Sequence, residues 1–185
     1  MTTEAPTIDS IFELYLSAGH NAYRGEMVSQ LEHALQAGFA AERAGAPIEL
    51  IVAALLHDYG HYIYDMEAAD ILRGVHDRHD TIGAQALAVV LPAAVTEPIR
   101  LHIEAKRYLC AVDSSYLASL SRGSAFSLRV QGGPYSARQA AEFGALAHAQ
   151  DAAQVRRWDD GAKVPGLRTP DLEHFRPYLA ACWRG

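Results

Sequence analysis

Cysteine is scarce in this 185-residue chain, which contains only Cys110 and Cys182. The two residues are far apart and form no CxxC pair, so we expect neither a thiolate zinc site nor a disulfide framework. A chain without disulfides fits a reducing compartment, and we therefore expect a cytoplasmic protein. Any metal site would need nitrogen and oxygen ligands, and the nine histidines could supply the nitrogen.

Long hydrophobic runs and basic blocks are also missing. No stretch reaches the roughly 18 apolar residues of a membrane span, and the N-terminus lacks the basic and apolar regions of a secretion signal. The 22 acidic and 16 basic residues give a formal net charge of −6. A membrane and a nucleic acid are therefore poor candidates as partners, and we expect a monomer or a small homo-oligomer that acts on a small molecule.

Helical periodicity dominates the sequence. Apolar residues recur at three- and four-residue spacings, whereas the alternating runs of strands are nearly absent, and this predicts an all-α fold. With 50% hydrophobic residues the chain can form one domain over 1–185. The segment 47–56 is apolar on nearly all sides and predicts a central buried helix. Other helices are expected over 9–19, 26–44, 79–90, 92–110, 114–120, 137–143, 147–158 and from 172 onward.

Three further segments predict loops or turns. Residues 59–77 combine glycines with tyrosines and predict a loop with short helical pieces. The stretch 131–135 contains two consecutive glycines and a proline, which is typical of a turn. Residues 161–170 carry two glycines and two prolines and predict an ordered loop.

The adjacent pair His57-Asp58 ends the apolar helix. A charged aspartate at such a place is costly unless it is paired or binds a metal. A buried His–Asp pair by itself is often only a hydrogen-bonded structural pair, but further histidines and an aspartate lie on or after other predicted helices. Helical folds build two-metal sites from such inward-facing groups. The candidate metal ligands are His33, His57, Asp58, His79, His102 and Asp159.

Polar and basic companions accompany these candidates. If the helix over 26–44 extends back through Gly25, then Tyr23, Glu26 and Gln30 share one face with His33. His61, Lys106 and Arg156 stand three or four residues from a candidate ligand, and together they suggest a positive pocket for an anion. Taken singly, each such pair also fits an ordinary solvated helix face.

The order of these residues resembles the HD-domain superfamily, in particular its two-metal members. The segments Tyr23-Arg-Gly-Glu26, Gln30-Leu-Glu-His33, His57-Asp58-Tyr-Gly-His61, Ala105-Lys106-Arg-Tyr and Gln131-Gly-Gly-Pro are more closely similar to mixed-valent diiron oxygenases that cleave hydroxylated aminophosphonates. The similarity runs from about Tyr23 to Lys163-Val-Pro-Gly and covers most of the chain. It implies a helical HD fold with two irons, Fe(II) and Fe(III), and dioxygen as cosubstrate.

The resemblance also implies a role for each candidate ligand. Asp58 would bridge the two irons. His33, His57 and Asp159 would complete one iron site, and the remaining two histidines would complete the other. These two are His79 and His102.

Further positions match residues that contact substrate in the family. Tyr23 matches a resting-state iron ligand that moves away when substrate binds, and Glu26 would meet the cationic end of the substrate. The groups that would surround the phosphonate are His61, Lys106, Ser124 and Arg156. Ser121 and Ser127 are near enough to be alternatives to Ser124. Four of these residues are expected to be catalytic: Tyr23, Glu26, His61 and Lys106.

The resemblance implies oxidative cleavage of a carbon–phosphorus bond, which gives phosphate and a carboxylic acid. The substrate would be 2-amino-1-hydroxyethylphosphonate, giving glycine, or its trimethylammonio analogue, giving glycine betaine. We favour the trimethylammonio compound because tyrosines can bind a quaternary ammonium. The alternative is that these tyrosines only pack the core. The residues considered are Tyr59, Tyr62 and Tyr64 with Asp65 and Asp70, and also Tyr15, Tyr23 and Tyr108.

Three other functions remain open from the sequence. An HD phosphohydrolase would use a metal-bound hydroxide, but it does not require Tyr23, Glu26 or Lys106. A regulatory HD module without catalysis would not need all six ligand positions. A diiron HD oxygenase of polyols would keep the metals and change the substrate, although the basic companions favour an anion.

Overall fold

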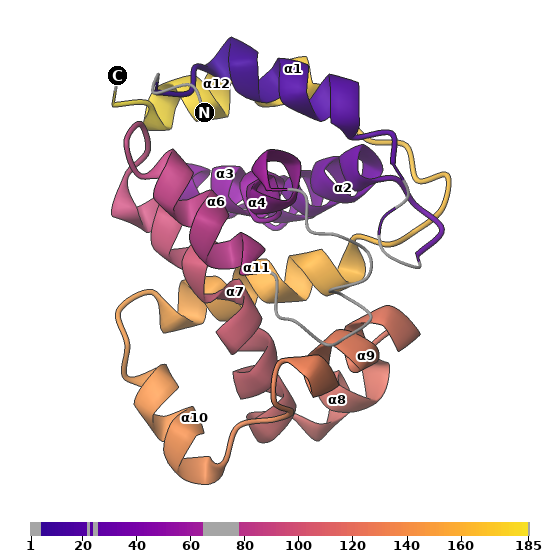
Figure 1. Cartoon of the computed structure of the whole chain (residues 1–185), viewed down its shortest axis with the longest axis vertical. Coiled ribbons are helices and arrows are strands. Elements are labelled where there is room, and N and C mark those ends of the chain that lie inside the picture. Colours follow the sequence, from indigo (N-terminus) through magenta and orange to yellow (C-terminus); the bar gives the residue numbers. More distant parts are fainter. Residues whose placement is uncertain (1–4, 22, 24–25, 65–77, 185) are drawn as a thin grey trace.

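The computed structural model describes residues 5–21, 23, 26–64 and 78–184. This part of the chain is built from α-helices and contains no strand, which confirms the predicted all-α fold (Figure 1). The helices are α1 (Ile8–Ala18), α2 (Gln30–Arg43), α3 (Ile48–Leu56), α4 (Tyr59–Ile63), α6 (His79–Leu87), α7 (Ala93–Val112), α8 (Ser114–Ser119), α9 (Arg122–Val130), α10 (Ala137–Gly144), α11 (Ala149–Gly161) and α12 (Leu172–Cys182).

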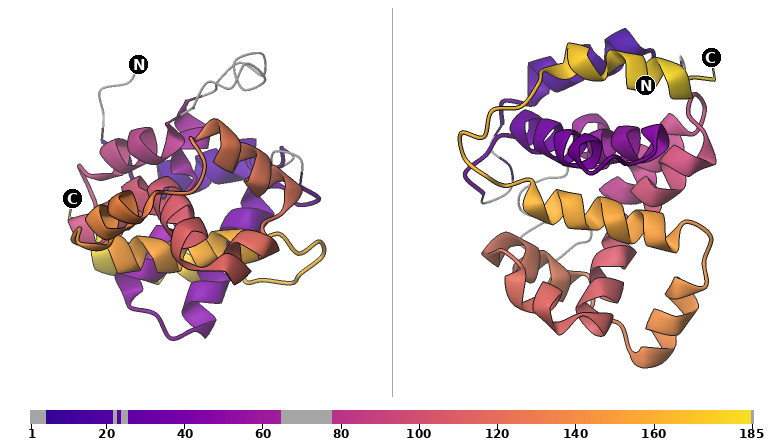
Figure 2. Two further views of the ribbon diagram at one scale, coloured as in Figure 1. Left: turned by 90° about the horizontal axis from the view of Figure 1, so that it is seen from below. Right: turned by 180° about the vertical axis from the view of Figure 1, so that it is seen from behind.

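Helix α3 forms the centre of the core, as its apolar sequence predicts. All its residues from Leu50 to Leu56 are buried, and each buried Leu, Ile or Val contributes about 1.5–3 kcal/mol to folding. Helices α1 and α12 lie together at one end of the molecule, above α2 and α3, and α8, α9 and α10 lie at the other end (Figures 1 and 2). Helices α7 and α11 run between these ends, and the polar end of α3 faces them.

Two glycines let α4 and α6 approach closely. A Cβ atom on Gly60 would lie 2.0 Å from the carbonyl oxygen of His79, and one on Gly83 would lie 2.7 Å from the nitrogen of Gly60. Only glycine fits such a backbone contact. The close approach brings the rings of His61 and His79 into a stack with their centroids 3.8 Å apart.

The start of α2 differs from the prediction. Ser29 caps the helix, because its Oγ accepts from the Glu32 backbone N–H at 3.1 Å while Glu32 Oε2 accepts from the Ser29 N–H at 2.7 Å. This capping box starts the helix at Gln30 rather than at Glu26. The prediction that Tyr23 and Glu26 share a helix face with His33 is therefore wrong. These two residues lie in a preceding turn, where the Glu26 N–H donates to the Tyr23 carbonyl at 2.7 Å.

Two other helices depart from their predicted bounds. Helix α9 was not predicted, because its serines and Gly123 have low helix propensity. Ser121 nevertheless caps it by accepting from the Ser124 N–H. Helix α11 continues to Gly161, so Asp159 lies inside the helix rather than after it. In the parts of the chain described above, no helix combines the length and the apolarity needed to cross a lipid bilayer.

Candidate functional site

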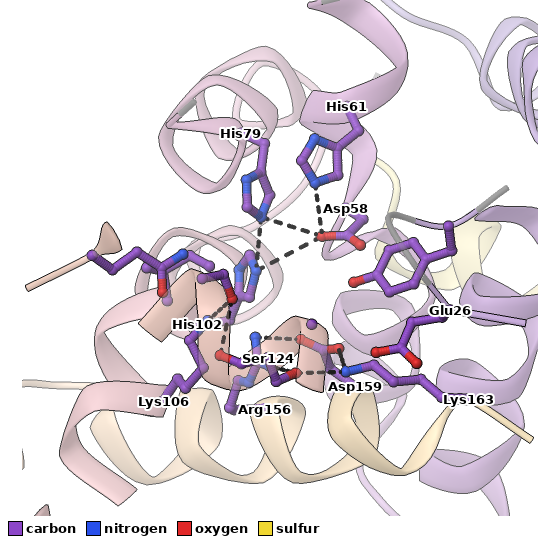
Figure 3. A pocket seen from close by; sticks show the side chains of 15 residues that line it. Glu26, Asp58, His61, His79, His102, Lys106, Ser124, Arg156, Asp159 and Lys163 are labelled. Atoms are coloured by element: carbon purple, nitrogen blue, oxygen red, sulfur yellow. Dashed lines mark hydrogen bonds and ion pairs between the residues drawn. The ribbon is translucent and has the colours of Figure 1, made fainter. Parts of the chain in front are cut away.

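A cavity of about 100 Å³ lies where α4, α6, α7, α9 and α11 meet. Since one water needs about 10–15 Å³ of such space, the cavity can hold a small polar ligand. The sequence candidates converge on it from these separate elements (Figure 3). Those that line it are Tyr23, Glu26, Asp58, His61, His79, His102, Lys106, Ser124, Arg156 and Asp159. His33 and His57 are fully buried and adjoin Asp58.

Asp58 stands between two groups of histidines. Its Oδ2 lies 3.6 Å from His33 Nε2 and 3.5 Å from His57 Nε2. Its Oδ1 lies 3.3 Å from His79 Nε2, and 3.8 Å from both His102 Nε2 and His61 Nε2. Each carboxylate oxygen therefore faces its own set of imidazole nitrogens. This is the geometry in which one carboxylate can serve two metal ions.

Backbone carbonyls fix the orientation of three of these histidines. A carbonyl oxygen only accepts hydrogen bonds, so the Nδ1 atom that contacts it carries the proton and Nε2 presents a lone pair. These carbonyls are the acceptors that the sequence did not reveal. The contacts join His33 to Ala162 (2.8 Å), His57 to Ala54 (2.8 Å) and His102 to Ile99 (2.6 Å).

The Nε2 atoms then point at one another in pairs. His33 Nε2 lies 3.0 Å from His57 Nε2, and His79 Nε2 lies 3.2 Å from His102 Nε2. Burial, followed by the neighbouring histidines, lowers the pKa of His102 well below its usual value. A neutral ring at each of His33 and His57 brings two lone pairs face to face, which is unfavourable unless a cation lies beside them.

Two buried carboxylates at this place each have an oxygen that lacks a hydrogen bond. Asp58 Oδ2 and Asp159 Oδ1 are buried and accept none from the described residues. Burial alone would raise the pKa of Asp58, but His57, His61 and His79 hold it well below its usual range. A buried charge of this kind is costly unless it coordinates a metal. The cluster is thus a candidate metal-binding site, and its nitrogen and oxygen donors suit iron.

Among the described residues, two sets of donor atoms lie close enough to hold a metal ion. One is His33, His57 and Asp58, and the other is Asp58, His61 and His79. The second set contains His61, which the resemblance assigned to substrate, whereas it assigned His102 to the metal. Because His61 and His102 are equally distant from Asp58 Oδ1, both can reach a metal at this oxygen.

The other side of the cavity is basic. Lys106 is buried, and its Nζ donates to Ser127 Oγ at 2.8 Å. Burial, followed by the charge of Arg156, lowers the pKa of Lys106 to about 7. The guanidinium of Arg156 is also buried and contacts Asp159 Oδ2 through Nη1 at 2.6 Å. Both cations point at the space in front of the histidines, as Figure 3 shows, which suits an anionic ligand.

Sequence reasoning missed Asp160 and Lys163 as site residues. Lys163 lines the cavity, and its Nζ donates to Ser124 Oγ at 2.8 Å and to Asp160 Oδ1 at 3.1 Å. Asp160 also binds Arg156. The signal was present in the spacing, because Asp160 lies four residues after Arg156 on the same face of α11. Lys163 follows three residues later, just after the helix ends.

Arg107 joins the segment Ala105-Lys106-Arg-Tyr to the segment Gln131-Gly-Gly-Pro. Its Nε donates to the Gly133 carbonyl at 2.8 Å, and its guanidinium carbon lies 4.4 Å from the ring centroid of Tyr135. Gly132 and Gly133 have φ values of +98° and +74°, which favour glycine. The clamp holds the turn so that Gln131 lines the cavity, where its Oε1 is buried and accepts no hydrogen bond from the described residues.

The turn before α2 forms another wall of the cavity. Tyr23 stacks on His33 with the ring centroids 3.9 Å apart and an angle of 18° between the planes. Glu26 Oε1 accepts from Ser121 Oγ at 2.6 Å. Ser121 therefore binds Glu26 and caps α9, whereas Ser124 and Ser127 line the cavity.

Most tyrosines that were considered for an ammonium lie elsewhere. Tyr15 stacks between Tyr59 and Tyr62, with centroid distances of 6.4 Å and 4.1 Å, and its hydroxyl donates to Leu55. Tyr108 packs against Phe143. Among the described lining residues, Tyr23 is the one tyrosine. The structure supports the alternative of core packing for Tyr15, Tyr59, Tyr62 and Tyr108, whereas Tyr64 is 49% exposed. Asp65 and Asp70 lie outside the described residues.

The helical fold and the His–Asp cluster define the class of the protein. A family model of the HD domain matches residues 31–131, more than half of the chain. The chain belongs to the HD-domain family.

Two relatives narrow this assignment. The chain is 45% identical over 181 residues to the hydroxymethylphosphonate dioxygenase of Gimesia maris, covering 97% of this chain and 90% of that protein. It is 39% identical over 175 residues to the 1-hydroxy-2-(trimethylamino)ethylphosphonate dioxygenase (glycine-betaine-forming) of Leisingera caerulea, covering 93% and 88%. Within its family, the chain therefore belongs with the HD-type phosphonate dioxygenases, and this confirms the resemblance drawn from the motifs.

Proposed function

We propose that this protein is a diiron dioxygenase that cleaves the carbon–phosphorus bond of a 1-hydroxyalkylphosphonate. The observation that carries the proposal is the position of Asp58, whose two oxygens face separate histidine groups at 3.3–3.8 Å beside a basic pocket. We further propose a cytoplasmic enzyme, because both cysteines are free and buried, and a monomer or small homo-oligomer.

The proposed ligand set is the one that the family resemblance implies. Asp58 would bridge the irons, with His33, His57 and Asp159 on one side and His79 with His102 on the other. When bound, a mixed-valent Fe(II)/Fe(III) pair would supply Lewis acidity toward the substrate oxygens and reduction of dioxygen. The protein adds fixed imidazole orientations, because the Nδ1 atoms of three of these histidines are held by backbone carbonyls.

The basic side would hold the phosphonate. Lys106 and Arg156 can donate hydrogen bonds to its oxygens. Ser124 lines the same side of the cavity with its hydroxyl proton donated to Asp160, and His61 lies across the cavity beside the metal cluster. Charge-assisted hydrogen bonds of this kind contribute about 1.5–3 kcal/mol each. They would also stabilise the additional negative charge on the phosphorus oxygens as the bond to carbon breaks.

We propose hydroxymethylphosphonate as the substrate, in place of the trimethylammonio compound favoured from the tyrosines. Three cations line the cavity, Lys106, Arg156 and Lys163, and Glu26 is its one carboxylate outside the metal cluster among the described lining residues. Its Oε1 is already engaged by Ser121. A small dianion without an amine suits this charge pattern, and the name of the Gimesia maris relative points the same way.

The expected products are formate and phosphate. One dioxygen is consumed, both of its oxygen atoms are retained in the two products, and one proton is released at neutral pH. A second candidate is a substrate with an amino or trimethylammonio group, giving glycine or glycine betaine. The free Oε2 of Glu26 favours this candidate, since a carboxylate can pair with an ammonium.

The test is anaerobic loading with iron, followed by assays with each of the three hydroxyphosphonates. We expect phosphate release to require dioxygen and to be fastest with hydroxymethylphosphonate. Phosphate release under nitrogen at the same rate would identify a phosphohydrolase instead. Faster turnover of a nitrogen-containing substrate would overturn the substrate assignment and keep the reaction.

A further inference from the structure

We propose that Asp160 is a positioning residue that holds the cavity-lining side chains of Arg156, Ser124 and Lys163 in a fixed arrangement at the basic side of the cavity. The proposal rests on the proposed function in that it assumes an anion at the basic side. Asp160 does not itself line the cavity, in contrast to the three donors that it binds.

Asp160 Oδ1 accepts a hydrogen bond from each of the three side chains. The donors are Arg156 Nη2 at 2.6 Å, Ser124 Oγ at 2.8 Å and Lys163 Nζ at 3.1 Å. These groups come from α9, from α11 and from the segment after α11. One carboxylate oxygen therefore fixes the relative positions of three side chains from separate elements.

Asp160 Oδ2 accepts two further hydrogen bonds, which hold the carboxylate in place. These come from Arg156 Nε at 2.8 Å and from the hydroxyl of Tyr116 in α8. Together the two oxygens accept five hydrogen bonds, more than the roughly four lone-pair positions of a carboxylate, so Asp160 has no capacity left for a further donor. The side chain is only 14% exposed, so water adds little to this network.

The arrangement fixes which donors Arg156 can offer a ligand. Asp160 takes its Nε hydrogen and one Nη2 hydrogen, and Nη1 forms an ion pair with Asp159 Oδ2 at 2.6 Å. Because Asp159 Oδ2 accepts no hydrogen bond from the described residues, the Nη1 hydrogens stay available to a ligand in the cavity. Because the guanidinium is planar, two contacts with Asp160 set the direction of these N–H groups. Asp160 therefore aligns the anion site with Asp159, the proposed metal ligand.

A purely electrostatic role for Asp160 predicts the opposite result when its charge is removed. A carboxylate behind the pocket repels an incoming anion, so neutralising it would tighten anion binding if charge alone mattered. The positioning role predicts weaker binding, because an amide in place of the carboxylate would turn N–H groups toward donors and release Arg156, Ser124 and Lys163. The sign of the change in affinity distinguishes the two roles.

The experiment compares Asp160→Asn with Asp113→Asn in the iron-loaded protein under anaerobic conditions. Asp113 is a matched control, because it pairs with Arg157 at 3.1 Å and caps α8 without lining the cavity, and asparagine also caps helices well. Affinity for inorganic phosphate is measured by calorimetry, and iron content and thermal stability are measured on the same samples.

We expect Asp160→Asn to bind phosphate at least about tenfold more weakly while retaining the wild-type iron content, since a lost charge-assisted hydrogen bond is worth about that factor. In turnover, KM should rise more than kcat falls. Asp113→Asn should stay within about twofold of wild type. Unchanged or tighter binding in Asp160→Asn would overturn the proposal, as would a loss of iron that accounts for the weaker binding.

A milder variant keeps the proposal testable if Asp160→Asn does not fold. Tyr116→Phe removes one hydrogen bond to Asp160 from a buried ring, and we expect two- to fivefold weaker phosphate binding, in line with one neutral hydrogen bond. Wild-type affinity in this variant would count against the proposal. The proposed function is tested separately, by the release of phosphate from hydroxyphosphonates. If wild-type protein releases none, the proposed function fails, but the phosphate affinities of the variants can still follow the order expected for Asp160.

Discussion

Asp159 and Asp160 are neighbours in α11, yet their surroundings are opposite. Asp159 Oδ1 is buried and accepts no hydrogen bond from the described residues, as is also true of Asp58 Oδ2 across the cavity. Asp160 accepts five. Asp159 therefore keeps an oxygen to which no described residue donates a hydrogen bond, whereas Asp160 already has every hydrogen bond that it can accept.

This difference separates the cavity into two functional sides. Buried charges persist where they are paired, hydrogen-bonded or bound to a metal. The side of Asp58 and Asp159 would be completed by a metal ion, whereas the side of Asp160 is already organised by hydrogen bonds within the protein. Arg156 connects them, since it contacts both aspartates. If this division is right, mutations on the first side change metal content and mutations on the second change anion affinity.

Asp58→Ala should give the largest effect. Both proposed metal positions share this carboxylate, so we expect iron content to fall from two equivalents to nearly none. Turnover should fall at least about a thousandfold, because a catalytic metal contributes several kcal/mol to transition-state stabilisation. Metal analysis after anaerobic loading and a phosphate-release assay check the prediction. Retention of two irons would contradict the bridging role.

Gly60→Ala should disturb only the part of the metal side formed by α4 and α6. Its Cβ would lie 2.0 Å from the His79 carbonyl oxygen, and overpacking of this kind destabilises a protein by about 1–3 kcal/mol. We expect a lower free energy of unfolding in denaturant titrations and loss of the metal on the His79 side first, leaving about one iron.

Gly161→Ala is the matched control for this change. Nothing lies within 4 Å of a Cβ atom at Gly161, which ends α11, so stability should be unchanged or slightly higher. Two irons in both variants would show that the α4–α6 contact does not set the position of His79.

Lys106→Met tests the anion side without touching a proposed ligand. Methionine keeps most of the buried volume and removes the ammonium that donates to Ser127. We expect two irons as in wild type and about 10–100-fold weaker binding of inorganic phosphate, which corresponds to about 1.5–3 kcal/mol. Arg138→Met, at a side chain that is 85% exposed, should leave both quantities unchanged. Iron loss equal to that of Asp58→Ala would break the division into two sides.

The sequence predicts the metal side better than the anion side for a physical reason. Few residue types ligate metals, and the aspartate of His57-Asp58 follows an apolar helix, where a charge is costly unless it is paired or binds a metal. The anion side depends on Asp160, whose type is common at surfaces and whose role appears only when α8, α9 and α11 are brought together. The tyrosines illustrate the same limit, because the sequence around Tyr15 is compatible both with a ring stacked in the core and with a ring that lines a pocket.

The accuracy of the predicted helix bounds was limited, because hydrophobic periodicity does not reveal the capping hydrogen bonds that start and end a helix. The capping box at Ser29 and Glu32 decides where α2 starts, and it removes Tyr23 and Glu26 from the helix. Both still reach the cavity, because the preceding turn folds back over His33. Their assignment to the site stays a prediction, and the helical reason given for it was wrong.

The smallest expected effect is a pH dependence that belongs to the anion side alone. Burial and Arg156 lower the pKa of Lys106 to about 7, so its charge is present below this pH and is lost as the pH rises. The quantity to follow is the phosphate dissociation constant of Lys106→Met divided by that of wild type. The effect of the ionisation of phosphate cancels in this ratio, because it is the same for both proteins. We expect this ratio to fall by about tenfold between pH 6 and pH 8, because only about a tenth of the free protein keeps the charged form at pH 8. Calorimetric titrations of both proteins across this range measure it. A ratio that does not change with pH would mean that Lys106 stays charged throughout, and that its contact with Ser127 rather than a shifted ionisation sets its contribution.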